Sequence, residues 1–143
     1  MNREVFRRKI ELQAKKLMKK FKDWDLEVLF PITRKGIDTS VRFIGTRHET
    51  YIDDNEVEDE VIGWFHTHPF GICDFSRADI RTALAEGRQV IAVGVPQTGE
   101  VKVLFRDEFP VYRRLRVYRR RKYRRSSHRI RYNASKNVSR VRE

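Results

Sequence analysis

Apolar residues recur at helical spacing near the start of the chain. They follow one another at intervals of four, four, three and four residues, and Lys and Arg fill the opposite face: Phe6, Ile10, Ala14, Leu17 and Phe21. This stripe predicts an amphipathic helix over about residues 2–22, with one face turned towards a core. Asn2 suits the N-cap, because its side-chain oxygen can accept from a free N–H of the first turn.

Shorter apolar segments follow, with lengths typical of strands. Alternating or continuous apolar runs bounded by turn residues predict strands at residues 26–32, 40–44, 61–68, 89–95 and 101–105. Turns are expected at residues 33–36 and 96–99. Seven acidic residues among positions 49–60 indicate an exposed connection.

Together the elements predict one domain. A second helix is expected from about Ser76 to Glu86, followed by Gly87 at its C′ position, with an inward face made of Ile80, Ala83 and Leu84. Strands mixed with two helices on one sheet predict an α/β (α+β) single domain, with a central mixed β-sheet flanked by helices and an end near Pro110. A chain of 143 residues is long enough for one such core and short for two.

Charge divides the chain at the same place. Residues 111–143 hold fourteen of the 32 Lys and Arg residues and one of the 20 acidic residues, so they carry all of the excess in the net charge of +12. We therefore expect a nearly neutral domain over residues 1–110 and a basic C-terminal extension over residues 111–143. A single cysteine, no apolar leader and no apolar run of membrane length make the cytoplasm the expected location, without a membrane partner.

The chemistry concentrates at His66-Thr67-His68-Pro69 and at Ser76 and Asp79, a few residues further on. Strand side chains alternate between faces, so His66 and His68 point the same way. Two imidazoles and the Asp79 carboxylate can supply three ligands of a zinc ion, with the fourth position left for water. Each piece also has a plainer interpretation: Ser76 and Asp79 form a capping box, and the histidines are ordinary strand residues. A ligand in the first turn of a helix can still cap it, so the two interpretations are compatible.

This arrangement resembles the JAMM (MPN+) family of zinc metallopeptidases, in which an upstream glutamate precedes His-x-His-Pro, about six residues and Ser-x-x-Asp. Residues 63–65, before the first histidine, are also similar to the family pattern. The resemblance covers about residues 2–110 and implies an MPN/cytidine-deaminase-like architecture. It further implies one zinc ion held by His66, His68 and Asp79, and an oxyanion stabilised by Ser76.

The glutamate of the pattern, which would take a proton from water, is assigned to Glu27. It lies thirty-nine residues before His66 within an apolar segment. Asp23 and Asp25 are nearby alternatives. The family pattern of small residues and glycine after the glutamate is replaced here by residues 29–31.

Cys73 lies between the two halves of the motif. Many family members have cysteine at this point, and the resemblance implies a packing residue. A fourth zinc ligand is the alternative, although it would close the site to water. An exposed Cys73 could also link two chains if the protein dimerises, which the sequence leaves open.

The basic extension interleaves arginine with tyrosine. Arginine neutralises phosphates and tyrosine stacks on bases, so we expect RNA, DNA or another polyanion to be its partner. The candidate contacts are Arg119, Arg120, Arg121, Lys122, Arg124 and Arg125. Its first part is expected to be helical and the remainder flexible; a solvated tail, or docking onto the acidic residues 53–60, remains open. His48 and His128 lie among polar residues and are interpreted as solvated.

Two function classes follow. The resemblance implies an isopeptidase that removes ubiquitin-like modifiers from lysine side chains. The alternative is a catalytically weak MPN-type scaffold that binds RNA or DNA through the arginine-rich extension. A retained metal triad favours the enzyme.

Overall fold

The computed structural model describes residues 2–45 and 52–112. The chain divides into two compact units, Met1–Phe109 and Pro110–Glu143. All helices and strands below belong to the first unit. The proposed nucleic-acid contacts in the extension, as well as His48 and His128, lie outside the described residues.

One mixed sheet forms the centre of the first unit. Its strands are β1 (Val28–Thr33), β2 (Gly36–Ile37), β3 (Phe43–Ile44), β4 (Gly63–Thr67), β5 (Val90–Val95) and β6 (Glu100–Phe105). The main order is β2-β1-β4-β5-β6. Both β2 and β3 pair with the same edge of β1, β3 at the start of that strand and β2 at its end. The β4–β5 pair is parallel and the other pairs are antiparallel. The expected α+β domain with a mixed central sheet is confirmed.

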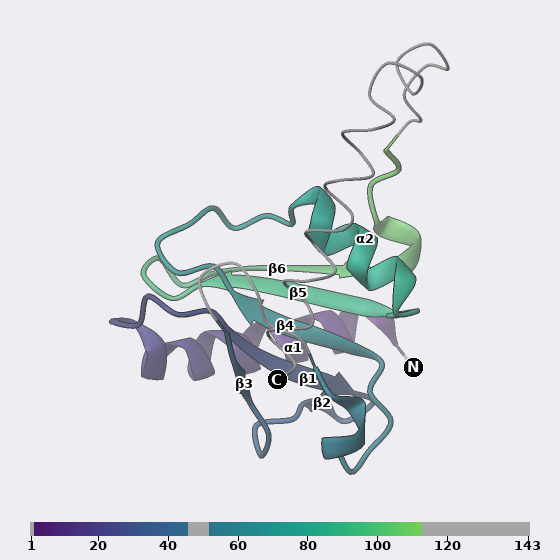
Figure 1. Ribbon diagram of the computed structural model, residues 1–143, viewed down its shortest axis with the longest axis horizontal. Helices are drawn as coiled ribbons and strands as arrows, with labels where there is room; N and C mark the ends of the chain where they lie inside the picture. Colours follow the sequence, from purple (N-terminus) through teal and green to yellow (C-terminus); the bar gives the residue numbers. More distant parts are fainter. Residues whose placement is uncertain (1, 46–51, 113–143) are drawn as a thin grey trace, which may run out of the picture. The chain divides into compact units, whose positions relative to one another are not determined.

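Helices cover both faces of this sheet (Figure 1). The helix α1 (Arg3–Met18), continued by the 3₁₀ turn η1 (Lys19–Phe21), buries its predicted apolar stripe against one face, where Phe30 and Phe65 lie. Asn2 is its N-cap, as predicted. The helix α2 (Arg77–Ala85) connects β4 to β5 and packs Ile80 and Ala83 on the opposite face. Gly87 follows α2 with φ +69°, which the expected C′ position requires.

Two predictions about burial and extent were wrong. The strand expected over residues 40–44 is reduced to Phe43–Ile44, because β2 occupies the rest of that β1 edge. Leu84 is exposed, since the smaller Ala83 makes the close approach to the sheet and Leu84 lies on the flank of α2. The acidic residues of the connection that the structure describes are exposed or half-buried, as expected, and they include the 3₁₀ turn η2 (Asp54–Glu56). Ile52 and Val57 of the same connection are nevertheless buried against the α2 face.

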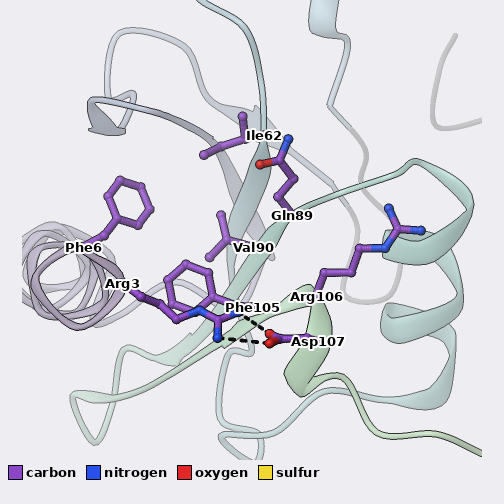
Figure 2. A pocket seen from close by; sticks show the side chains of 8 residues that line it. All are labelled: Arg3, Phe6, Ile62, Gln89, Val90, Phe105, Arg106 and Asp107. Atoms are coloured by element: carbon purple, nitrogen blue, oxygen red, sulfur yellow. Dashed lines mark hydrogen bonds and ion pairs between the residues drawn. The ribbon is translucent and has the colours of Figure 1, made fainter. Parts of the chain in front are cut away.

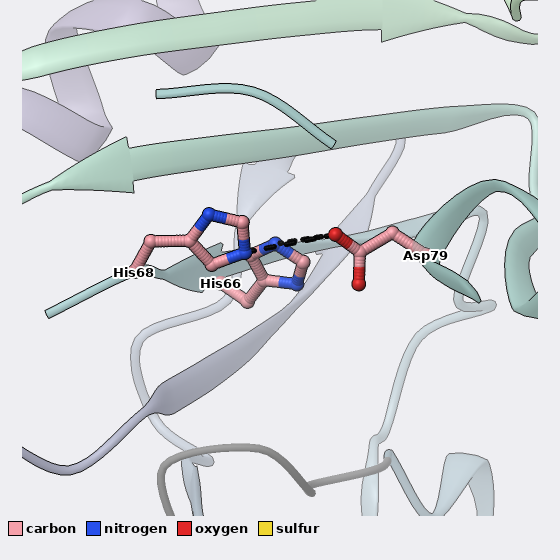
Figure 3. Close-up of side chains that lie close together, drawn as sticks. All are labelled: His66, His68 and Asp79. Atoms are coloured by element: carbon pink, nitrogen blue, oxygen red, sulfur yellow. Dashed lines mark ion pairs between the residues drawn. The ribbon is translucent and has the colours of Figure 1, made fainter. Parts of the chain in front are cut away.

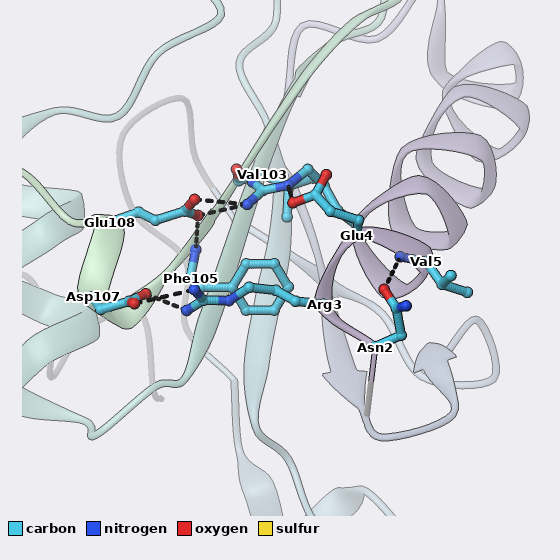
Figure 4. Close-up of polar contacts among 9 residues, drawn as sticks. Asn2, Arg3, Glu4, Val5, Val103, Phe105, Asp107 and Glu108 are labelled. Carbon is cyan, nitrogen blue, oxygen red and sulfur yellow. Dashed lines mark hydrogen bonds and ion pairs between the residues drawn. The ribbon is translucent and has the colours of Figure 1, made fainter.

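Arginines of α1 fasten it to the end of the sheet (Figure 4). Arg7 donates to the Val103 carbonyl at 2.5 Å and to both oxygens of Glu108 at 2.8 and 2.7 Å. Its guanidinium lies 4.9 Å from the centre of the Phe105 ring, and Arg3 contacts the same ring and Asp107. Glu108 and Asp107 belong to the 3₁₀ turn η3 (Arg106–Glu108). None of the helices in the described ranges is long and apolar enough to cross a membrane.

Candidate metal centre

The end of β4 presents both histidines on the face that α2 covers. His66 is opposite Leu29 of β1 and Val93 of β5, and all three residues lie on this face. The imidazoles of His66 and His68 stack with their centroids 4.5 Å apart, as the two-residue spacing in a strand allows (Figure 3). The alternation in the sequence therefore predicted their relative placement correctly.

Asp79 reaches the histidines from the first turn of α2. Its Oδ2 lies 3.7 Å from Nε2 of His66 and 3.6 Å from Nε2 of His68. The same oxygen accepts a hydrogen bond from the Ser76 N–H at 2.8 Å, while Ser76 Oγ accepts from the Asp79 N–H at 3.0 Å. The capping box and the approach to the histidines thus coexist, because the box orients the carboxylate towards β4.

These three residues fit a metal ion. One ligand atom from each lies within 4.8 Å of the others. Among the described residues, His66 Nε2 is the one fully buried side-chain nitrogen or oxygen atom without a hydrogen-bond partner. Leaving such an atom unsatisfied is costly, and a bound cation would satisfy it. Two imidazole nitrogens and a carboxylate oxygen are the donor set of an open catalytic metal site.

The second nitrogen of His68 has its own partner. Nδ1 lies 3.0 Å from the Ile72 carbonyl, which can only accept, so Nδ1 carries the proton. In the neutral ring this leaves the Nε2 lone pair directed at the site, which is the arrangement that metal-binding histidines use.

Burial and nearby charges shift the titration of the cluster. Burial lowers the pKa of His66, which keeps its ring neutral and able to bind a metal. Burial also lowers the pKa of His68, but Asp79 and the Ile72 carbonyl raise it by more. Burial raises the pKa of Asp79, yet the two histidines and the Ser76 N–H outweigh it and the net shift is downward.

Glu27 is on the other side of His66 from Asp79. It directly precedes β1, and its Oε1 lies 3.7 Å from Nδ1 of His66. Its side chain is only 12% exposed, and burial raises the pKa of this carboxyl to about 8. A carboxyl group with a pKa near neutrality is suited to general acid–base work. The alternatives Asp23 and Asp25 are exposed on the segment before β1.

Cys73 is not part of the ligand cluster. It is half-buried among the residues of the α2 face, and its thiol lies 3.8 Å from the Val93 carbonyl. Burial raises the pKa of the thiol, which disfavours the thiolate that a metal needs. These contacts match the packing role and not the alternative of a fourth ligand.

Sequence reasoning missed the support around His66. The Trp64 ring stacks on it at 4.5 Å, and Phe75 lies at 6.2 Å. On the reverse face of β4, Thr67 Oγ1 accepts from the Val28 N–H at 2.9 Å, which ties the motif to β1. Strand alternation could have found Trp64, which is two residues before His66, whereas no local signal indicates Phe75.

A separate pocket of about 450 Å³ includes none of these residues (Figure 2). Apolar side chains of α1, β5 and β6 line it, with polar groups around them: Arg3, Phe6, Ile62, Gln89, Val90, Phe105, Arg106 and Asp107. This pocket is therefore distinct from the histidine cluster.

A family match covers the residues of this candidate metal centre. Residues 28–85 match the family described as JAB1/Mov34/MPN/PAD-1 ubiquitin protease, and the matched segment contains His66, His68, Ser76 and Asp79. Over this segment the chain is therefore similar to JAB/MPN domain proteins. Glu27 lies one residue before the matched segment.

Among solved structures, the chain is similar to a JAB1/MPN domain protein from Archaeoglobus fulgidus. The identity is 15% and the TM-score 0.41, over 73% of this chain and 92% of that one. No curated protein sequence matches the chain.

Proposed function

We propose that this protein is a zinc-dependent isopeptidase that hydrolyses the bond between a ubiquitin-like modifier and a lysine side chain. The observation that carries the proposal is the buried, unsatisfied Nε2 of His66, which lies beside His68 and Asp79 with Glu27 on its other side. The family match adds support, because the family is described as a ubiquitin protease.

His66, His68 and Asp79 would hold the zinc ion. When bound, zinc supplies a Lewis acid that polarises the scissile carbonyl and makes a water molecule acidic near neutral pH. The protein's part is to present these ligands in a fixed arrangement. The Ile72 carbonyl orients His68, and the Ser76 N–H orients Asp79.

Glu27 would move the proton. Its carboxylate takes a proton from the attacking water and delivers it to the nitrogen of the departing lysine amine. Burial disfavours the charged carboxylate and therefore makes it a stronger base than an exposed glutamate. The β1–β4 pairing keeps the carboxylate beside the histidines.

Ser76 would stabilise the oxyanion. Its Oγ accepts a hydrogen bond from the Asp79 N–H through a lone pair, which leaves the hydroxyl proton available to a substrate oxygen. Its exposure at the start of α2 leaves it accessible to substrate. One such donor typically contributes about 3–4 kcal/mol to the transition state.

The test is metal-dependent hydrolysis by the full chain. The substrate is a fluorescent peptide whose C-terminal glycine is joined to a lysine ε-amine, and the same sequence with an ordinary peptide bond is the control. We expect cleavage of the isopeptide by the zinc-loaded protein, its loss on chelation and its return with added zinc. Absence of cleavage by protein shown to carry one zinc per chain would refute the isopeptidase.

A further inference from the structure

A turn beside the metal centre holds an aromatic residue in a backbone conformation that favours glycine. The Gly71 N–H donates to the His68 carbonyl at 3.1 Å, which closes a turn over His68-Pro69-Phe70-Gly71. Phe70 has φ +55° and is the one non-glycine residue with positive φ in the described ranges. This conformation costs a residue with a Cβ about 1–2 kcal/mol.

The Phe70 ring gains little packing in return. Its side chain is 68% exposed, and Ile72, two residues later, is 81% exposed. Packing inside the domain therefore does not account for an aromatic residue at this position. Residues with a strained backbone cluster at ligand-binding sites when packing within the fold does not offset the free energy of the strain. The positive φ of Phe70 is therefore a reason to look for a binding role.

The turn is held firmly in this position. The Phe70 N–H donates to Oε1 of Gln97 at 2.8 Å, and Nε2 of Gln97 donates to the Lys22 carbonyl at 2.7 Å. A Cβ on Gly71 would lie only 3.2 Å from the Cβ of His68, which shows how closely the turn approaches this candidate ligand. Phe70 and Ile72 are thus presented by a braced segment.

Ile72 joins this segment directly to the metal centre. Its backbone carbonyl accepts from His68 Nδ1 at 3.0 Å, so one imidazole ring separates it from the ligand atom Nε2. The nearby charge of Asp74 is neutralised by Lys102 at 2.7 Å. The exposed surface of Phe70 and Ile72, the Phe70–Ile72 patch, therefore suits an uncharged apolar group close to the reacting bond.

We propose that the Phe70–Ile72 patch binds an apolar side chain of the modifier, within the last four residues before the scissile carbonyl. The proposal rests on the isopeptidase function. On the amine side of an isopeptide bond, a lysine stem of four methylenes separates the bond from the next backbone. The acyl side alone therefore brings variable side chains close to the bond.

The test measures binding and cleavage separately on the zinc-loaded full chain. The binding probes are fluorescein-labelled hexapeptides that end in a free glycine carboxylate, with serine or a single leucine at each of the four preceding positions. Fluorescence anisotropy gives their Kd values. Isopeptides of the same sequences give kcat and KM.

We expect leucine at one position to lower Kd and KM about tenfold for the wild type, with kcat changed less than twofold. The double variant Phe70→Ala/Ile72→Ala should reduce this preference to below twofold and keep one zinc per chain, because the hydrogen bond that orients His68 comes from the backbone carbonyl of Ile72 and not from its side chain. Phe70→Leu/Ile72→Val should retain most of it. Leu12→Ala is the matched control, since Leu12 is 69% exposed on α1, which packs on the other face of the sheet.

Each alternative result has a distinct meaning. Cleavage without a leucine preference, or a preference that the double variant retains, would refute binding of the modifier by the Phe70–Ile72 patch. Either result would still support the isopeptidase function. A leucine preference in binding without cleavage would support the patch and refute the isopeptidase. A dimer in sedimentation velocity that the double variant abolishes would assign the patch to a second copy of the chain and overturn the proposal.

Discussion

Glu27 and His66 are thirty-nine residues apart in the sequence, yet Oε1 of Glu27 lies 3.7 Å from Nδ1 of His66. The antiparallel pairing of β1 with β4 produces this approach. The bond from the Val28 N–H to Thr67 Oγ1 fastens the strands at this point. The separation between the proposed base and the metal ligands is therefore set by the sheet and not by a loop.

Replacing the proposed base should separate catalysis from metal binding. For Glu27→Gln we expect kcat to fall by roughly 10² to 10⁴, because the amide cannot accept the proton, while zinc content stays at one per chain. Steady-state kinetics and elemental analysis measure the two quantities. Asp23→Asn is the control and should retain wild-type kcat. Equal loss of activity in both variants would contradict the assignment of Glu27.

The raised pKa of Glu27 predicts how pH affects the stability of the metal-free protein. The carboxyl has a pKa of about 8 in the fold and an ordinary value of 4.5, so between these values the folded state binds more protons than the unfolded state. The contribution of this carboxyl to stability therefore falls as pH rises through this interval, by an amount on the order of a few kcal/mol.

Glu27→Gln removes this dependence. With metal removed from both proteins, the stability of Glu27→Gln relative to wild type should be greater at pH 8 than at pH 5. Urea unfolding at both pH values measures the difference. A stability difference that is the same at the two pH values would contradict the burial of an ionisable Glu27.

Ser76 should contribute to stability and catalysis through different atoms. Ser76→Ala removes the N-cap and should lower stability by about 1 kcal/mol, whereas Ser76→Gly should cost only a few tenths. Both variants lose the hydroxyl, so both should lose roughly 10² to 10³ in kcat, and Ser76→Thr should retain most activity. Thermal unfolding and kcat are compared across the set. Activity that follows stability would assign Ser76 to capping alone.

The contact between Arg7 and Glu108 should add an acid-sensitive part to stability. The hydrogen bonds from Arg7 lower the pKa of Glu108 below its ordinary value of 4.5. Its contribution is therefore fully present above about pH 4.5 and is lost as pH falls through the lower, folded-state pKa.

Glu108→Gln should accordingly lower Tm at pH 7, and the difference from wild type should shrink at pH 3. Differential scanning calorimetry at the two pH values measures it. Glu58→Gln, at an exposed position in the acidic connection, should change Tm less. If Glu108→Gln lowers Tm more at pH 3 than at pH 7, the contact between Arg7 and Glu108 is not the source of the acid-sensitive stability.

Local sequence patterns predicted much of the site. Period two in a strand placed His66 and His68 on one face, and the Ser76–Asp79 spacing indicated both a capping box and a third ligand. Each inference depends on residues within a few positions of one another. Local geometry alone decides such relations.

Relations between distant segments were harder to predict. The choice among Glu27, Asp23 and Asp25 depends on the register of β1 against β4, which the sequence around Glu27 does not encode. The burial of Ile52 and Val57 in an acidic segment depends on the α2 face that receives them. The positive φ of Phe70 contradicts its residue type and depends on the turn and on Gln97. Nucleic-acid binding by the extension stays a prediction, because its residues lie outside the described ranges.

The measurement that tests the central claim most directly is the metal content of purified wild type, His68→Ala and Asp79→Ala. The account predicts about one zinc per chain in wild type and its loss in both variants, with folding shown by circular dichroism. Wild-type protein that contains no zinc, and takes up none when zinc is supplied to the native chain, would contradict it.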